Sequence, residues 1–287
     1  MNGNTSLIPW VIQSNVGPID DVDHYWKAIK ARNNPRFKVS ASPFLDDRDE
    51  FTREYEGSSI AGVLKYLEKQ GIEKGKPAVW VGGIGFIEAA RKAGWKPWIF
   101  TDTETFNLKK YAEMWGERMI NSEGVFTTLG DFLNLPGPPD ELVFCRPIKD
   151  QKEFPGALIE RINLRRWVGQ IQGRGYNIDE TCDIYVGPPH GISHEWRMYM
   201  VEGKVVTGSY YTSEKYGPEE YTPPQDVVDY AEECAKIYSP APIFCLDICK
   251  TAGNLYIMEA GSYHSAGLYR SSAAKIVETI SNYWEEQ

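Results

Sequence analysis

Apolar and polar positions alternate in the last third of the chain in a pattern that predicts two β-hairpins. An apolar run at residues 198–201 is followed by the turn Glu202-Gly203 and by a second apolar run at residues 205–211. A glycine-containing two-residue turn between two such runs is typical of a hairpin. The second predicted hairpin joins residues 243–249 to residues 255–259 through another glycine-containing turn.

The first half of the chain has a different pattern, in which short apolar runs alternate with helical spacing. Ile60, Val63, Leu64 and Leu67 recur at helical intervals and predict a helix over residues 58–70, ended by Gly71. The same reasoning predicts strands at 7–12, 78–81 and 98–100, helices at 22–32 and 86–93, and a loop at 41–57. Strands that alternate with helices favour a small open α/β domain.

A linker separates this half from the hairpins. Pro136-Gly137-Pro138-Pro139 is the strongest break in the chain, and a strand is predicted directly after it at 141–146. The hairpins then follow with helices at 224–238 and 272–284. We therefore predict an α/β domain over residues 1–138 and an α+β domain over residues 139–287.

Composition and charge narrow the classes of function. The chain has 287 residues, of which 42% are hydrophobic and 25% charged, as in ordinary globular enzymes. A net charge of -9 argues against a broad nucleic-acid-binding surface. The five cysteines match no disulfide framework, and no apolar run reaches the roughly 18 residues of a membrane span. These features predict a reduced, cytoplasmic protein.

Two carboxylates stand in otherwise apolar strands of the second hairpin. A buried carboxylate is unfavourable unless it is paired or bound to a metal, and Asp247 and Glu259 fall near each other across the turn. Their oxygen atoms suit Mg²⁺. Zinc is the weaker interpretation, because the four histidines do not lie at ligand spacing with Cys245 and Cys249.

Cations occur close to these predicted strands. Arg146 ends the strand after the linker, and Lys152 lies in the loop that follows, which suits a phosphate clamp or a solvated turn. Glu195 and Arg197 lie on one face of their strand, because side chains repeat every two residues. They therefore face either water or a cleft, since the opposite face is apolar.

A partial nucleotide motif is interpreted as structural. Gly83 and Gly85 follow a predicted strand, but Glu88 stands where a third glycine would be and would repel a pyrophosphate. We predict a tight strand-to-helix turn there. The chain has neither a Walker P-loop motif nor a GxSxG elbow.

Several segments, taken in order, resemble a known superfamily. They are Phe144-Cys145-Arg146-Pro147 with Lys152, Glu195-Trp196-Arg197 with Ser209-Tyr210, and Asp247 and Glu259 with Gly267-Leu268-Tyr269; Trp80-Val81-Gly82-Gly83-Ile84 and Gly94-Trp95-Lys96-Pro97 match upstream. This ordered set resembles the ATP-grasp superfamily, in particular a divergent clade common in bacteriophage and bacterial genomes. The resemblance implies an ATP-grasp fold, with two α+β subdomains clasping ATP, preceded by a small α/β domain.

The resemblance also implies a reaction and its cofactors. Such enzymes use ATP and Mg²⁺ to activate a carboxylate as an acyl-phosphate, which an amine or thiol then attacks. We therefore expect a ligase acting on small-molecule or peptide substrates, in the host cytoplasm if the source is viral. A kinase on the same scaffold, or a degenerate ATP-grasp module that binds a partner, is the alternative.

Site roles follow from the same resemblance. Asp247 and Glu259 would bind Mg²⁺, and Gly261 replaces the usual asparagine ligand, for which Ser262 or His264 would have to compensate. The residues expected to contact phosphates are Arg146, Lys152 and Arg197. Those expected to line the hinge beside adenine with backbone hydrogen bonds are Asp183, Ile184, Tyr185 and Val186, and Glu195 would orient Arg197 or a ribose.

Overall fold

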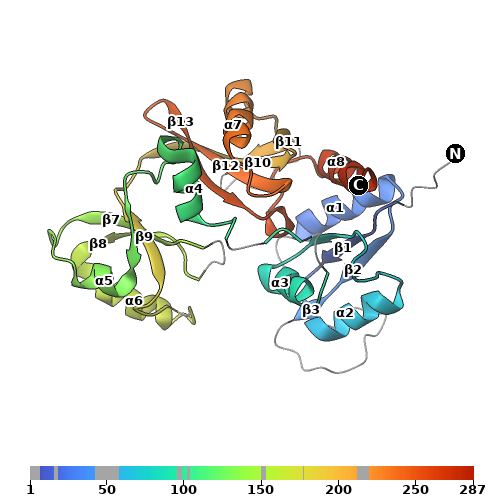
Figure 1. The fold of residues 1–287 in the computed structure, drawn as a ribbon, viewed down its shortest axis with the longest axis horizontal. Helices are drawn as coiled ribbons and strands as arrows, with labels where there is room; N and C mark the ends of the chain where they lie inside the picture. The colour runs from blue at the N-terminus through green and yellow to red at the C-terminus, as the bar shows by residue number, and fades with distance from the viewer. Residues whose placement is uncertain are drawn as a thin grey trace.

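The chain folds into three regions that lie in a row, as Figure 1 shows. The computed structural model describes residues 7–15, 19–42, 58–95, 99–101, 104–149, 153–176, 178–211 and 220–287. None of the helices in these ranges is long and apolar enough to cross a membrane.

The N-terminal region is built on a parallel sheet, because its strands are joined by helical crossovers. The sheet has the order β2-β1-β5, formed by Arg36–Val39, Trp10–Gln13 and Val79–Val81. Its helices are α1 (Ile19–Ala31), α2 (Ile60–Lys69) and α3 (Ile84–Lys92), and a short parallel pair joins β3 (Ala41–Ser42) to β4 (Ser58–Ser59). The predicted helix at 58–70 starts at Ile60, because the Ser59 side chain accepts a hydrogen bond from Gly62 N and caps it.

Two sequence predictions in this region need comment. Residues 99–101 form no strand, and residue 98 lies outside the described residues, so the strand expected at 98–100 is wrong for its described part. The Phe100 backbone N–H donates to His264 Nε2 at 2.9 Å instead of to a neighbouring strand. Of the loop predicted at 41–57, residues 43–57 lie outside the described part of the chain.

An antiparallel sheet forms the region at the opposite end of Figure 1. Its order is β6-β9-β7-β8, formed by Val125–Thr128, Asp183–Gly187, Leu142–Pro147 and Ala157–Glu160. The helices α5 (Leu129–Asn134) and α6 (Leu164–Gln172), the latter not predicted, share its hydrophobic core. Strand β6 precedes the proline-rich linker and pairs with β9 beyond it. The division at residue 138 stays a prediction, and a boundary near residue 104 would keep this sheet whole.

The central region is an antiparallel sheet of order β11-β10-β12-β13. Its strands are Lys204–Tyr210, Ile192–Val201, Ile243–Thr251 and Asn254–Gly261, which confirms both predicted hairpins. Helices α4 (Leu108–Trp115) and α7 (Gln225–Ile237) cover one face, where Trp196, Met198 and Met200 are buried. Short 3-10 helices occupy Gly116–Arg118, Arg161–Asn163 and Tyr263–Ser265.

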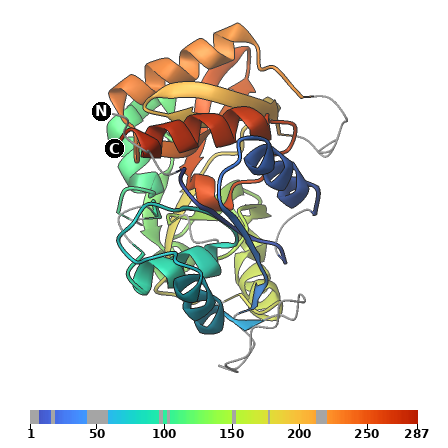
Figure 2. The same ribbon diagram turned by 90° about the vertical axis from the view of Figure 1, so that its right-hand side faces the viewer.

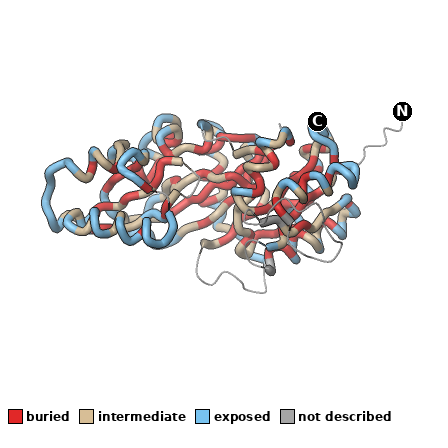
Figure 3. Tube along the Cα trace, turned by 90° about the horizontal axis from the view of Figure 1, so that it is seen from below, coloured by how far each residue is buried: buried red, intermediate tan, exposed pale blue. Residues whose placement is uncertain are grey.

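The last helix ties the two ends of the chain together. Helix α8 (Ala273–Glu285) lies against α1 and the N-terminal sheet, as Figures 1 and 2 both show. Trp10 Nε1 donates to Ser281 Oγ at 3.0 Å, and Arg32 donates to both carboxylate oxygens of Glu285 at 2.8 and 2.6 Å. Figure 3 shows that the buried chain runs continuously through this junction. The N-terminal region and the central sheet therefore share a hydrophobic core.

Candidate functional site

A row of charged side chains crosses the central sheet. Arg197 on β10 lies opposite Asp247 on β12, and Asp247 lies opposite Glu259 on β13. Side chains opposite each other in an antiparallel sheet lie on the same face. The predicted proximity of Asp247 and Glu259 is therefore confirmed, and Arg197 joins them.

Asp247 and Arg197 form a bidentate ion pair. Arg197 Nε donates to Asp247 Oδ1 at 2.9 Å, and a second guanidinium nitrogen donates to Oδ2 at 2.7 Å. The two side chains are 4% and 13% exposed, so both charges have left water. Burial lowers the pKa of Arg197, but the negative charge of Asp247 outweighs that effect and holds this pKa well above its ordinary value. The guanidinium therefore stays charged, as a buried paired charge requires.

A second ion pair joins the central sheet to the other antiparallel sheet. Arg146 on β7 donates to Glu259 Oε2 at 2.5 Å, across 113 positions of sequence. This pair is more open, because the Glu259 side chain is 31% exposed. Two arginines thus reach one carboxylate row, each from a different sheet.

Two tyrosines enclose Arg197. Its guanidinium lies 5.0 Å from the ring centroid of Tyr211 and 5.4 Å from that of Tyr269, within cation–π range. Tyr269 has a positive φ of 53°, which is unfavourable for a residue with a bulky side chain. Backbone strain of this kind gathers at functional sites. Tyr269 was part of the matched motif but was not nominated for the site, and Tyr211 gave no sequence signal.

Glu195 lies on the same strand face as Arg197. Burial, reinforced by the negative charges of Asp247 and Glu259, raises the pKa of Glu195 to about 7. Its carboxyl group therefore changes protonation near neutral pH, as the raised pKa of a catalytic acid or base often does.

The raised pKa predicts how stability depends on pH. The folded state binds a proton at Glu195 that the unfolded state has lost, so stability falls as pH rises from about 4.5 to about 7 and stays lower above that. Glu195→Gln removes this loss. We expect the variant to gain about 1–2 kcal/mol relative to the wild type between pH 4.5 and pH 8.5, measured by urea unfolding at both pH values.

A matched variant separates this effect from general charge removal. Glu233→Gln removes a carboxylate from an exposed position on α7. The stability difference between Glu233→Gln and the wild type should stay nearly constant with pH. An equal pH response in both variants would contradict the assignment to Glu195.

His264 has a structural role between two regions. Its Nδ1–H donates to Trp80 O at 2.6 Å, and its Nε2 accepts from Phe100 N at 2.9 Å. Burial lowers the pKa of His264 to about 4, so the ring is neutral. Since both ring nitrogens are engaged, the hypothesis that His264 replaces the missing asparagine as a metal ligand is wrong.

The predicted tight turn at Gly82-Gly83 is confirmed. Gly82 N donates to His264 O at 2.8 Å, and Gly83 N donates to Gln13 Oε1 at 2.9 Å. A Cβ at Gly82 would lie 2.8 Å from Gln13 Cβ, so this position has no space for a side chain. The turn fixes the β5–α3 junction through these contacts.

The remaining predicted contacts are placed less completely. Lys152 lies outside the described residues. Ile184, Tyr185 and Val186 are on β9, which pairs with β6 on one side and β7 on the other. A central strand uses its backbone groups in its two ladders. The adenine hinge stays a prediction, and the backbone available to it begins at Gly187, where β9 ends.

The carboxylate row fits a magnesium ion by the chemistry of its donors. Asp247 and Glu259 supply oxygen ligands from adjacent strands, and Mg²⁺ commonly binds one or two carboxylates and completes its shell with water and phosphate oxygens. No group of three or more His, Cys, Asp or Glu side chains in the described residues is arranged to hold a metal. The row therefore suits an ion that a phosphate ligand shares, and suits an all-protein metal cage poorly.

Comparisons with known proteins agree with this geometry. The model of an ATP-grasp domain family, the third family of its clade, matches residues 47–282. No curated protein matches the chain in sequence.

Solved structures with similar folds include several ligases. The ATP-grasp ligase PsnB, in complex with the precursor peptide PsnA2 and AMPPNP, has a TM-score of 0.53 and 11% identity, covering 99% of each chain. D-cycloserine synthetase DcsG has a TM-score of 0.54 and 12% identity, covering 96% of this chain and 99% of that one. Biotin carboxylase from Campylobacter jejuni has a TM-score of 0.60 and 12% identity, covering 99% of this chain and 72% of that one. At these identities the likeness concerns the fold, and it confirms the expected ATP-grasp architecture.

Proposed function

This chain belongs to the ATP-grasp domain family whose model it matches, and from that premise we propose that it is an ATP- and Mg²⁺-dependent ligase. It joins a small-molecule or peptide carboxylate to an amine or thiol in the cytoplasm. The observation that carries the proposal is the row of Arg197, Asp247 and Glu259, with Arg146 reaching it from the other sheet.

The arginines suit the binding of phosphates between the two sheets. A guanidinium group offers planar, paired donors that match phosphate oxygens. Arg197 is held in one orientation by Asp247 and by the rings of Tyr211 and Tyr269. Preorganised donors stabilise charge that develops during reaction, because they need no rearrangement at that moment. Arg146 and Lys152 complete the cationic side of the proposed site.

Asp247 and Glu259 are the proposed magnesium ligands. Mg²⁺ bound there would neutralise charge on the β- and γ-phosphates. Glu195 lies beside this row and, with its raised pKa, holds or releases a proton near neutral pH. Its proposed role is to orient Arg197 or a ribose hydroxyl.

The proposed chemistry has two steps. A carboxylate oxygen of the substrate attacks the γ-phosphorus, the bond to the ADP oxygen breaks, and an acyl-phosphate forms. The nitrogen or sulfur lone pair of the acceptor then attacks the acyl carbon, phosphate leaves with the electrons of the C–O bond, and the proton of the nucleophile passes to water. Arg146 and Arg197 would stabilise the negative charge on the transferred phosphoryl group in both steps.

Calorimetry tests the nucleotide site. AMPPNP should bind the wild type with Mg²⁺ and more weakly without it. In Glu259→Gln the Mg²⁺-dependent part should fall by at least about tenfold, which corresponds to about 1.4 kcal/mol. Because Glu259 is partly exposed, this variant should keep the fold, which circular dichroism checks.

A second variant supplies the control. Glu113→Gln removes an exposed carboxylate from α4 and should bind the analogue as the wild type does. Equal Mg²⁺-dependent binding in all three proteins would refute the assignment of Glu259. Absence of binding in the wild type would refute the nucleotide site altogether. Release of phosphate only when a second, nucleophilic substrate is added would separate a ligase from a kinase.

A further inference from the structure

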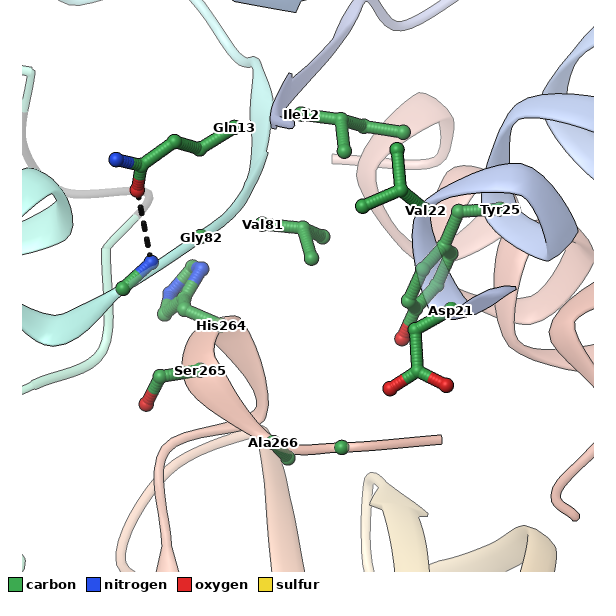
Figure 4. Close-up of a pocket in the computed structure, with 12 residues that line it drawn as sticks. Ile12, Gln13, Asp21, Val22, Tyr25, Val81, Gly82, His264, Ser265 and Ala266 are labelled. Carbon is green, nitrogen blue, oxygen red and sulfur yellow. Dashed lines mark hydrogen bonds between the residues drawn. The ribbon is translucent and has the colours of Figure 1, made fainter. Parts of the chain in front are cut away.

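A pocket lies beside the carboxylate row, where the N-terminal sheet meets the loop after β13. It has a volume of about 160 Å³ and lies at the carboxyl ends of β1 and β5. Ile12, Val22 and Val81 form its apolar wall, and Figure 4 shows their side chains gathered together. A cavity of about 150 Å³ can accommodate a benzene molecule. The pocket therefore suits an apolar group of that size.

Asp21 gives this pocket its charge. Among the described residues that line it, Asp21 is the one carboxylate, and none is Lys or Arg. His264, which also lines the pocket, is neutral because burial lowers its pKa to about 4. Asp21 is itself buried, and its Oδ2 accepts a hydrogen bond from Leu268 N at 3.0 Å. The lining thus combines an apolar wall with a single negative charge.

The electrostatics of the lining favour a cation over an anion. The charge of Asp21 is felt at Tyr25, whose pKa is raised chiefly by burial and further by Asp21. Placing a second carboxylate in this pocket would bring like charges together with little water between them, whereas an ammonium group would be attracted. The occupant should therefore carry its positive charge at one end of an apolar body.

Gly267 connects this pocket to the carboxylate row. A Cβ added at Gly267 would lie 3.4 Å from the Tyr269 ring and 3.7 Å from Asp21 Oδ2. The Tyr269 ring in turn lies against the Arg197 guanidinium. A molecule bound at Asp21 is thus separated from the proposed phosphate site by little more than one residue of the loop.

We propose that this pocket binds the acceptor substrate, and that the acceptor is an amine with a compact apolar body whose ammonium group pairs with Asp21. The inference rests on the proposed ligase function and names one substrate class for it. It assigns amines, and not thiols or hydroxyl compounds, as the acceptors. The ammonium form is the one that is recognised, and it gives up a proton to water before the nitrogen attacks.

Direct binding without ATP tests this inference independently of the ligase reaction. Three probes of matched size are titrated into the full chain and followed by protein-observed NMR: benzylamine, benzyl alcohol and benzoate. We expect benzylamine to bind most tightly, and Asp21→Asn to weaken it by about tenfold while benzyl alcohol is unaffected. The asparagine oxygen can still accept from Leu268 N, so the loop keeps its hydrogen bond.

Two further variants separate recognition from structure. Asp23→Asn makes the same charge change on an exposed side chain of α1 and should bind benzylamine as the wild type does. Gly267→Ala introduces only ordinary contacts, so the fold should persist, and its methyl group should weaken benzylamine by crowding Asp21.

The outcomes are distinct. Tighter binding of benzoate than of benzylamine, or unchanged benzylamine affinity in Asp21→Asn, would overturn the proposal and leave Asp21 as a structural partner of Leu268. Benzylamine binding in a protein that fails to bind AMPPNP would uphold the amine pocket and refute the ligase. The failures of the two proposals can thus be told apart.

Discussion

Replacing Asp247 with asparagine should produce a protein that is both inactive and markedly less stable. The variant removes a proposed magnesium ligand and leaves the guanidinium of Arg197 buried without its opposite charge. Breaking a buried ion pair by removing one partner is strongly destabilising, so we expect a loss of about 3 kcal/mol in the free energy of unfolding. ADP release should fall by about a hundredfold or more, because Arg197 also loses its orientation.

Urea unfolding and a coupled ADP assay measure the two effects separately. Glu259→Gln is the informative comparison, since the Glu259 side chain is 31% exposed and water can reach the charge left on Arg146. We expect Glu259→Gln to lose activity with a stability change below about 1 kcal/mol. An Asp247→Asn protein as stable as the wild type would show that the bidentate pair contributes no net stability.

Trp10→Ala should cause the largest loss of stability among single core substitutions near the chain ends. Trp10 is fully buried on β1 and donates from Nε1 to Ser281 on α8. Replacement of a buried tryptophan by alanine costs about 3–5 kcal/mol through lost burial and the cavity left behind. Since this residue lies in a core shared by β1, α1 and α8, the loss should appear in one cooperative unfolding transition.

Differential scanning calorimetry and tryptophan fluorescence follow this prediction. Ser281→Ala removes the hydrogen bond while keeping the indole, and should cost only about 1 kcal/mol. Two separate transitions in the wild type, with Trp10→Ala shifting only one, would contradict a shared core. The same result would show that the N-terminal region unfolds independently.

The hairpins and the carboxylate row could be predicted because their signals are local. Alternation with a period of two, together with glycine turns, places Asp247 opposite Glu259 within a single hairpin. The helices near residues 60 and 273 follow equally from helical spacing and serine caps. The ordered motifs then identified the superfamily, and the family match confirms it.

What escaped sequence reasoning depends on contacts between distant segments. Arg146 meets Glu259 across 113 positions, and His264 binds the backbone of Trp80 across 184. No local pattern reports such pairs, because they arise from how sheets and loops pack. Strand β6 was missed for a related reason: its residues are largely exposed, and pairing with β9 is what makes it a strand.

The Arg146–Glu259 bridge has a consequence for cooperativity between ligands. In the absence of ligand each group neutralises the other across the two sheets. An anion that takes Arg146 leaves Glu259 with an unbalanced negative charge, which increases its attraction for a cation. A cation on Glu259 frees Arg146 for an anion in the same way. By thermodynamic linkage each ligand raises the affinity for the other by the same factor, so this single bridge makes nucleotide and metal mutual effectors.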